Sequence, residues 1–141
     1  MCAMSLGFPV NLWADVLGAL ERALPEEACG FLAGCSDRVE AVYPVPNELR
    51  SPTAYRMEPA AQIRAMTAIE RAGREIVAIY HSHPNGPPIP SATDVAEASY
   101  PVPYVICSRW PGGTSWLGRA FLLSPEGASE VEIDWLDMRK A

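Results

Sequence analysis

The sequence predicts an α/β domain in which a mixed, curved sheet is sandwiched by two or three helices. Apolar residues recur at helical spacing over residues 11–24 and 58–72. Short runs without charge, bounded by turn residues, lie at 28–34, 76–80 and 104–107 and are typical of buried strands. Helices and buried strands that alternate along one chain favour an α/β architecture. Because the chain has 141 residues, we expect a single domain over residues 1–141.

The first element is predicted to be a packing helix from Asn11 to Leu24. Asparagine commonly caps a helix, and Pro25 cannot continue one. The apolar side chains recur every three or four residues and would form the buried face of this helix: Leu12, Val16, Leu17, Leu20 and Leu24.

Two acidic residues, Glu26 and Glu27, stand directly before the run at 28–34. This run predicts a buried strand, and an acid at the edge of such a strand is ordinarily a solvated surface residue. The residues alone do not distinguish Glu26 from Glu27. Inside the run, Cys29 could be a hydrolase nucleophile. We favour a small packing residue there, because free cysteine is among the most buried residue types.

The middle of the chain predicts a strand, a loop and a helix. A turn at 36–38 leads to a strand at 39–43, which Pro44 and Pro46 limit to a sheet edge or end. Residues 47–57 are polar and predict a loop. The helix over 58–72 has Pro59 in its first turn and Gly73 after its end. We expect three of its apolar side chains to face the core: Ile63, Met66 and Ile69.

The last third of the chain predicts one short helix and three strands. The helix begins near residue 91 and is short, because residues 100–103 are proline-rich and extended. A buried strand at 104–107 and two partly buried strands, at 115–123 and 130–135, complete the expected sheet.

Both histidines of the chain, His81 and His83, directly follow the apolar run at 76–80. Alternate side chains of a strand point to the same face, so both imidazoles leave one face about 6–7 Å apart along the strand. This spacing lets the two rings bind one metal ion, although a lone histidine on an apolar strand is more often a hydrogen-bonded core residue. Ser82 points to the opposite face, and we expect it to have a structural role.

Ser91 and Asp94 follow a loop that is rich in proline and glycine. Their spacing is that of an ordinary helix N-terminus, with Ser91 as N-cap and Asp94 as a capping-box acid. From this first turn, Asp94 could also direct its carboxylate toward the two imidazoles. Two histidines and one carboxylate, with a fourth position left for water, are the ligands of a catalytic zinc site. The capping role and the ligand role are compatible.

The pattern of His81-Ser82-His83, seven residues, Ser91, two residues and Asp94 resembles the signature of the JAMM (MPN-domain) zinc metalloproteases. The resemblance is to small stand-alone bacterial members and covers residues 12–123. It implies the MPN fold, whose sheet is cytidine-deaminase-like, and one Zn²⁺ per chain held by His81, His83 and Asp94. In this family a catalytic glutamate precedes a short apolar strand, and the match falls on Glu27.

The resemblance also implies an activity, namely cleavage of a peptide or isopeptide bond at the C-terminal tail of a ubiquitin-like or sulfur-carrier protein. Glu27 would activate the zinc-bound water and return its proton to the leaving amine. Ser91 would stabilise the oxyanion, and the extended tail could pair with a sheet edge. Two alternatives stay open: a non-catalytic MPN scaffold that binds proteins, and a hydrolase of small-molecule amides at the same zinc site.

Composition excludes several other classes of function. The formal net charge is −6 and no cluster of Lys or Arg exists, which argues against a nucleic-acid binder that relies on phosphate neutralisation. No apolar run approaches the ~20 residues of a membrane span, and the N-terminus lacks the features of a signal peptide. The four cysteines form no C-x-x-C pair. We therefore expect a cytoplasmic protein without nucleic-acid or membrane partners, and the sequence leaves the oligomeric state open.

Overall fold

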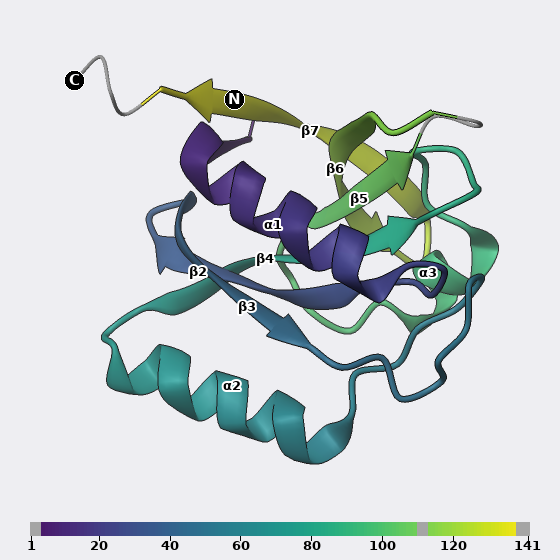
Figure 1. Cartoon of the computed structure of the whole chain (residues 1–141). Coiled ribbons are helices and arrows are strands. Elements are labelled where there is room, and N and C mark those ends of the chain that lie inside the picture. Colours follow the sequence, from purple (N-terminus) through teal and green to yellow (C-terminus); the bar gives the residue numbers. More distant parts are fainter. Residues whose placement is uncertain (1–3, 110–112, 138–141) are drawn as a thin grey trace.

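The computed structural model describes residues 4–109 and 113–137, which form seven strands and three helices (Figure 1). In chain order these elements are β1 (Ser5–Pro9), α1 (Val10–Ala23), β2 (Cys29–Cys35), β3 (Arg38–Val45), α2 (Pro59–Arg71), β4 (Glu75–His83), α3 (Ala92–Glu97), β5 (Tyr104–Arg109), β6 (Trp116–Ser124) and β7 (Gly127–Leu136).

The strands form one mixed sheet in the order β1-β3-β2-β4-β5-β6-β7, which closes into a barrel because β1 also pairs with β7. The pairs β1–β3, β1–β7 and β4–β5 are parallel, and the other pairs are antiparallel. The predicted mixed, curved sheet is confirmed, but the sequence pattern did not predict β1. Gly7 and Pro9 lie within its five residues, and both residue types are depleted in strands.

The two long helices lie on opposite sides of β2 and β3 (Figure 1). Successive residues of β2 supply the two cores, because side chains of a strand alternate between its faces. Leu32 packs in the core that contains Val16 and Leu20 of α1. Phe31 packs in the core that contains Ile69 of α2.

The first helix differs slightly from its prediction. It begins at Val10, and Pro9, not Asn11, occupies the N-cap position without a side-chain hydrogen bond. The chain passes directly from β1 into α1 at Pro9, whose φ of −60° suits the start of a helix. Asn11 therefore lies in the first turn and is exposed.

The second helix confirms its predicted position but not its predicted buried face. The carboxylate of Glu58 accepts hydrogen bonds from the backbone of Ala60 and Ala61, at 3.1 and 2.7 Å, and so caps the helix. Ile63 and Met66 are 64% and 39% exposed, so the expectation that they face the core was wrong. The inward stripe is formed instead by small residues at a spacing of four, followed by one isoleucine: Ala61, Ala65 and Ile69.

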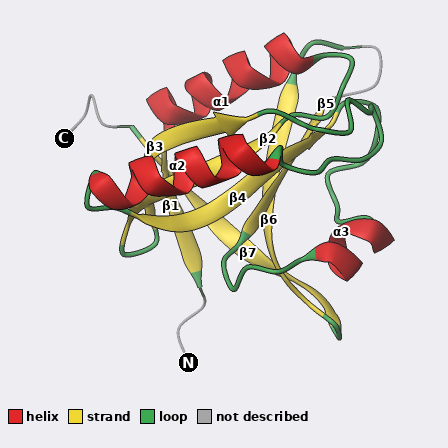
Figure 2. Cartoon of the chain, turned by 90° about the horizontal axis from the view of Figure 1, so that it is seen from below, coloured by secondary structure: helices red, strands yellow, loops and turns green. Residues whose placement is uncertain are grey.

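The barrel brings distant parts of the chain to the end of β4. Cys29 of β2 is paired with His81 of β4, so the segment that precedes β2 lies beside the histidines. Figure 2 shows α3 apart from the two long helices. Among the described residues, no helix is long and apolar enough to cross a membrane.

Candidate active site

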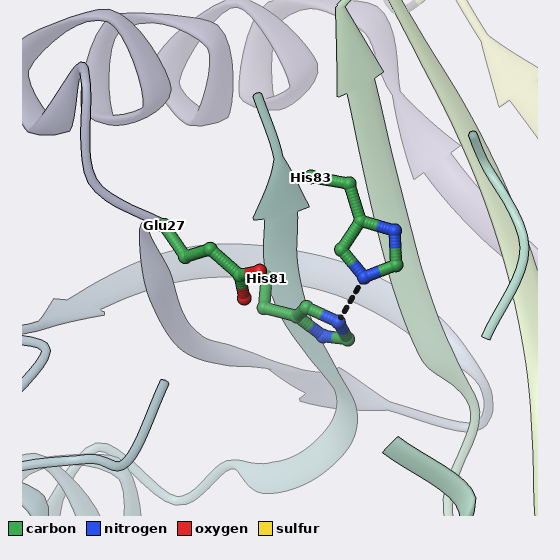
Figure 3. A group of neighbouring side chains, drawn as sticks. All are labelled: Glu27, His81 and His83. Atoms are coloured by element: carbon green, nitrogen blue, oxygen red, sulfur yellow. Dashed lines mark hydrogen bonds between the residues drawn. The ribbon is translucent and has the colours of Figure 1, made fainter. Parts of the chain in front are cut away.

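The two histidines converge at the end of β4 (Figure 3). Their Nε2 atoms are 3.1 Å apart, and their side chains lie on the same face of the strand as Ile79. His81 is completely buried and His83 is 9% exposed. Ser82 points to the opposite face, where its Oγ accepts a hydrogen bond from the Ala28 backbone at 2.8 Å. The expected shared face of the two imidazoles is therefore present.

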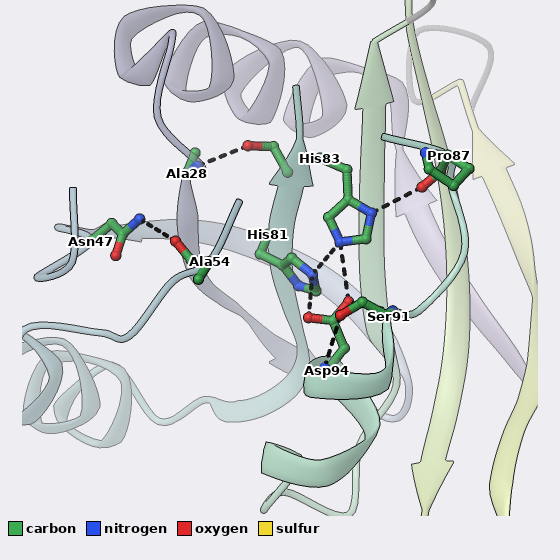
Figure 4. Close-up of polar contacts among 9 residues, drawn as sticks. Ala28, Asn47, Ala54, His81, His83, Pro87, Ser91 and Asp94 are labelled. Atoms are coloured by element: carbon green, nitrogen blue, oxygen red, sulfur yellow. Dashed lines mark hydrogen bonds and ion pairs between the residues drawn. The ribbon is translucent and has the colours of Figure 1, made fainter. Parts of the chain in front are cut away.

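Asp94 reaches both imidazoles from the first turn of α3 (Figure 4). Its Oδ1 lies 3.2 Å from His81 Nε2, and its Oδ2 lies 3.1 Å from His83 Nε2. The same residue forms a capping box with Ser91: the Asp94 N–H donates to Ser91 Oγ at 3.0 Å, and the Ser91 N–H donates to Asp94 Oδ2 at 2.8 Å. The cap thus fixes the carboxylate in the direction of the histidines.

Glu27 joins the cluster from the segment before β2 (Figure 3). It is 4% exposed, and its carboxylate lies within 4.8 Å of the ring nitrogens of His81 and His83. Glu26, which the residues alone could not separate from Glu27, is only half-buried. The structure therefore brings Glu27 to the histidines by pairing the start of β2 with the end of β4.

Burial and neighbouring charges shift the pKa values of all four groups. Burial raises the pKa of Glu27 to about 7, with His83 opposing the shift, and burial lowers the pKa of His81. Burial is the largest single effect on Asp94 and His83 and disfavours their charged forms, but several favourable interactions together outweigh it: hydrogen bonds from both histidines and the Ser91 backbone for Asp94, and the bonds to Asp94 and the Pro87 carbonyl for His83. The pKa of Asp94 is consequently held below its ordinary value, and that of His83 is raised.

The donor atoms of this cluster fit a metal cation. His83 Nδ1 must donate to the Pro87 carbonyl, 2.9 Å away, so the Nε2 of a neutral His83 presents a lone pair to Asp94 and His81. His81 Nδ1 is buried without a hydrogen-bond partner among the described residues. The separations of 3.1–3.2 Å resemble the roughly 3.3 Å between ligands of a tetrahedral ion with bonds of about 2.0–2.1 Å.

Two sets of residues could supply the ligands. Glu27 and the two histidines lie within 4.8 Å of one another, whereas the oxygens of Asp94 approach the same histidines to 3.1 and 3.2 Å. The shorter separations favour Asp94 as the third ligand. Ser91 remains exposed, and because its Oγ only accepts from Asp94 N–H, its own proton is free for another partner.

A cleft of about 180 Å³ opens beside Asp94 and is lined by residues that no sequence motif marks. Tyr55 lines this cleft together with Tyr100 and Tyr104, and its ring stacks on His81 with 4.5 Å between the centroids. Tyr55 belongs to the stretch at 47–57, which the sequence identified only as a polar loop. No periodicity or motif connects it with His81.

Cys29 is a packing residue in this structure. It is 2% exposed, and its Sγ donates to the Val45 carbonyl at 3.3 Å. Burial raises the pKa of its thiol to about 12, which opposes formation of the thiolate that a nucleophile requires.

Most of the chain is similar in sequence to curated proteins of several organisms. A probable TtuB-protein conjugate cleaving protease of Thermus thermophilus is 47% identical over 84% of this chain and 76% of the relative. A desampylase of Haloferax volcanii is 45% identical over 69% of this chain and 74% of the relative. A CysO-cysteine peptidase of Mycobacterium tuberculosis is 43% identical over 67% of this chain and 70% of the relative.

Solved structures share the fold. Protein DSY2949 from Desulfitobacterium hafniense superimposes with a TM-score of 0.84 at 32% identity, over 94% of this chain and 93% of that protein. AF2198, a JAB1/MPN domain protein from Archaeoglobus fulgidus, superimposes with a TM-score of 0.60 at 18% identity, over 94% and 97%. The second likeness confirms the predicted MPN-like fold.

A family model describes the segment that carries every residue of the cluster. The model for prokaryotic homologs of the JAB domain matches residues 9–121, which include Glu27, the two histidines, Ser91 and Asp94. The chain therefore belongs to the prokaryotic homologs of the JAB domain.

Proposed function

We propose that this protein is a zinc-dependent peptidase or isopeptidase that cleaves at the C-terminal tail of a ubiquitin-like or sulfur-carrier protein. The convergence of His81, His83 and Asp94 beside a buried Glu27 is the observation that carries this proposal. The relative named as a protein-conjugate cleaving protease supports a protein substrate.

Each residue of the cluster has a separate role in this proposal. His81, His83 and Asp94 hold one Zn²⁺ ion per chain. When bound, zinc would supply a Lewis acid able to polarise the scissile carbonyl and to lower the pKa of a water molecule. Pro87 holds the proton of His83 on Nδ1, which keeps Nε2 directed at the ion.

Glu27 acts as the general base and acid. Burial raises its pKa to about 7 in the metal-free protein, so the site favours a carboxyl that accepts a proton from the attacking water and returns it to the leaving amine. The Ser91 hydroxyl donates a hydrogen bond to the oxyanion of the tetrahedral intermediate. In other hydrolases, loss of one such hydrogen bond raises the activation free energy by roughly 3–4 kcal/mol.

The cleft beside Asp94 is a candidate site for an extended tail. It has a volume of about 180 Å³ and lies directly beside the proposed metal ligand Asp94. The expectation that the tail adds to a sheet edge has less support, because the barrel pairs β4 on both sides at the histidines. We therefore propose that the tail lies in the cleft, against Tyr55 and Tyr100.

The proposal is tested with a fusion of a ubiquitin-like protein to a reporter through its C-terminal tail. Zinc content and cleavage rate are measured for the wild type and for three variants. Glu27→Gln should retain one equivalent of zinc and lose cleavage by at least 10²-fold, whereas His83→Ala should lose both. The matched control Glu26→Gln should retain both.

Three outcomes would contradict the mechanism or favour an alternative function. Full activity of Glu27→Gln would show that the assigned mechanism is wrong, and zinc binding without any cleavage by the wild type would favour a scaffold. Equal rates for the protein fusion and for a small amide would favour a hydrolase of small molecules.

A further inference from the structure

Both backbone hydrogen bonds of Glu27 go to the loop at 47–57, whereas the next residue, Ala28, is bonded to Ser82 of β4. β2 begins two residues later, at Cys29. The Glu27 N–H donates to the Ser51 carbonyl at 2.8 Å, and the Glu27 carbonyl accepts from Asn47 Nδ2 at 3.1 Å. Both polar backbone groups of the proposed base are therefore bonded to this loop.

The side-chain amide of Asn47 forms hydrogen bonds with four backbone groups. Besides Glu27, its Nδ2 donates to the Ala54 carbonyl at 3.0 Å (Figure 4). Its Oδ1 accepts from the backbone N–H groups of Leu49 and Arg56, at 3.0 and 3.1 Å. Four backbone partners thus occupy two donors and two lone pairs, which is the full capacity of the amide.

The same loop also reaches a histidine. Tyr55, between the Asn47-bonded residues Ala54 and Arg56, stacks on His81 with an angle of 25° between the rings. One side chain thus connects the backbone of Glu27 with the residue that packs against an imidazole of the cluster.

We propose that Asn47 is a positioning residue for the reaction, and that it fixes Glu27 and Tyr55 relative to the histidines. The proposal rests on the function proposed above. Its physical reason is that misplacement of a catalytic group by about 1 Å can reduce a rate 10²-fold. The sheet fixes the chain at Ala28, next to Glu27, and the loop fixes the backbone of Glu27 itself.

The test uses Asn47→Asp, which preserves shape and the acceptor Oδ1 but replaces the donating –NH₂ with an oxygen facing two carbonyls. We expect kcat for the tail fusion to fall at least tenfold, with KM changed less than threefold. The dissociation constant for zinc, measured by competition with a chromophoric chelator, should change less than threefold. Asn11→Asp, at an exposed position of α1, serves as the matched control and should match the wild type.

Combination with Glu27→Gln separates positioning from a general loss of structure. If Asn47 acts through Glu27, Asn47→Asp should reduce the residual rate of Glu27→Gln less than threefold, because coupled residues are not additive. A further tenfold reduction in the double variant, or a kcat of Asn47→Asp within twofold of the wild type, would overturn the proposal.

Amide hydrogen exchange in the metal-free protein tests whether Asn47 holds the backbone of Glu27, and it requires no measurement of cleavage. In Asn47→Ala the amides of Glu27, Leu49 and Arg56 should exchange at least tenfold faster, while that of Ile69 in α2 should stay protected. Unchanged exchange at Glu27, or equal acceleration at Ile69, would contradict the positioning role. If the wild type fails to cleave the fusion, the proposed function fails, and exchange alone then decides whether Asn47 holds Glu27.

Discussion

Glu27 lies where two opposing effects act on one carboxyl group. Burial disfavours its charge, and His83 favours it, with the balance at a pKa of about 7. Asp94 is also partly buried, but direct hydrogen bonds with both histidines keep it ionised. Two carboxylates on one cluster therefore have pKa values on opposite sides of their ordinary range, which suits one for proton transfer and the other for binding a cation.

Removal of the Glu27 carboxylate should change how stability depends on pH in the metal-free protein. Its pKa is raised from 4.5 to about 7 on folding, so its contribution to stability is complete below about pH 4.5 and is lost as the pH rises through 7. From pH 4.5 to 8, the free energy of unfolding of the wild type should therefore fall relative to Glu27→Gln by up to about 3 kcal/mol. Urea denaturation in the presence of a chelator measures this difference.

The matched variant Glu26→Gln removes a charge from the same segment. Its difference from the wild type should vary with pH much less than that of Glu27→Gln. A difference for Glu27→Gln that stays constant over this pH range would show that burial does not shift the Glu27 carboxyl.

Local sequence patterns could predict some of these residues but not others. The shared face of His81 and His83 follows from strand alternation alone, and the direction of Asp94 follows from its capping turn. The selection of Glu27 depends on which residue of β2 pairs with His81, and a local pattern does not contain that register. Asn47 bonds the backbone of Glu27, and Tyr55 stacks on His81 of β4. Both contacts join segments that are distant in sequence, so no periodic signal marks these two residues.

At the scale of elements, the six residues of α3 depend on their cap more than a long helix would. Ser91→Ala removes the acceptor for the Asp94 N–H and should cost about 1 kcal/mol. Because the same cap orients the Asp94 carboxylate, the variant should also bind zinc roughly three- to tenfold more weakly. The matched control Ser91→Thr preserves the cap and should bind zinc like the wild type. Isothermal titration of the metal-free proteins with zinc measures the affinity of both variants. Equal affinity of Ser91→Ala would mean that the cap does not orient Asp94.

The centre of the sheet depends on the absence of a side chain at residue 30 in β2. A Cβ added to Gly30 would lie 2.6 Å from both the Tyr43 carbonyl and the Tyr80 ring. Gly30→Ala should therefore destabilise the protein by about 1–3 kcal/mol or more through overpacking. Gly7→Ala in β1, whose added Cβ would meet its nearest atom at an ordinary 3.4 Å, is the control and should change stability by less than about 1 kcal/mol. Equal effects of the two variants in urea denaturation would contradict this account.

For α2, the hydrophobic pattern predicts the position of the helix but not its buried face. The position of α2 was predictable because Pro59 suits its first turn and Gly73, whose φ is 73°, follows its end. Its buried face was not, because Ile63 and Met66 are more apolar than the alanines that pack on the sheet. Small side chains let the helix approach the strands closely, and the periodicity of large apolar residues does not register this contact.

At the scale of the whole molecule, β1 joins the two ends of the sheet. Phe8 is fully buried, stacks on Trp135 of β7 at 5.3 Å between centroids, and meets Trp13 of α1 at 5.7 Å. Phe8→Ala should cost about 3–5 kcal/mol, although residue 8 is not part of the cluster. Leu117→Ala, at a position 50% exposed, should cost less than about 1 kcal/mol. Chemical denaturation of both variants gives the comparison, and similar costs would mean that closure contributes little to stability.

The expectation of one domain over residues 1–141 stays a prediction, and the same denaturation experiments address it. A single transition that is superimposable for tryptophan fluorescence and far-UV circular dichroism would support one cooperative unit. Closure of the barrel was beyond sequence analysis, because β1 is short and its partner β7 lies more than a hundred residues later. Only the assembled sheet brings the two strands together.

The barrel is least extensively paired between β1 and β3. β1 and β3 are paired in register only at Gly7 and Arg38, so the rest of β3 could offer its backbone to a strand of another molecule. Pro44 interrupts that stretch and has no N–H to donate, which is a common protection against edge-to-edge aggregation. Substitution of this proline would therefore be expected to leave an isolated molecule intact and to harm the protein through self-association in concentrated solution.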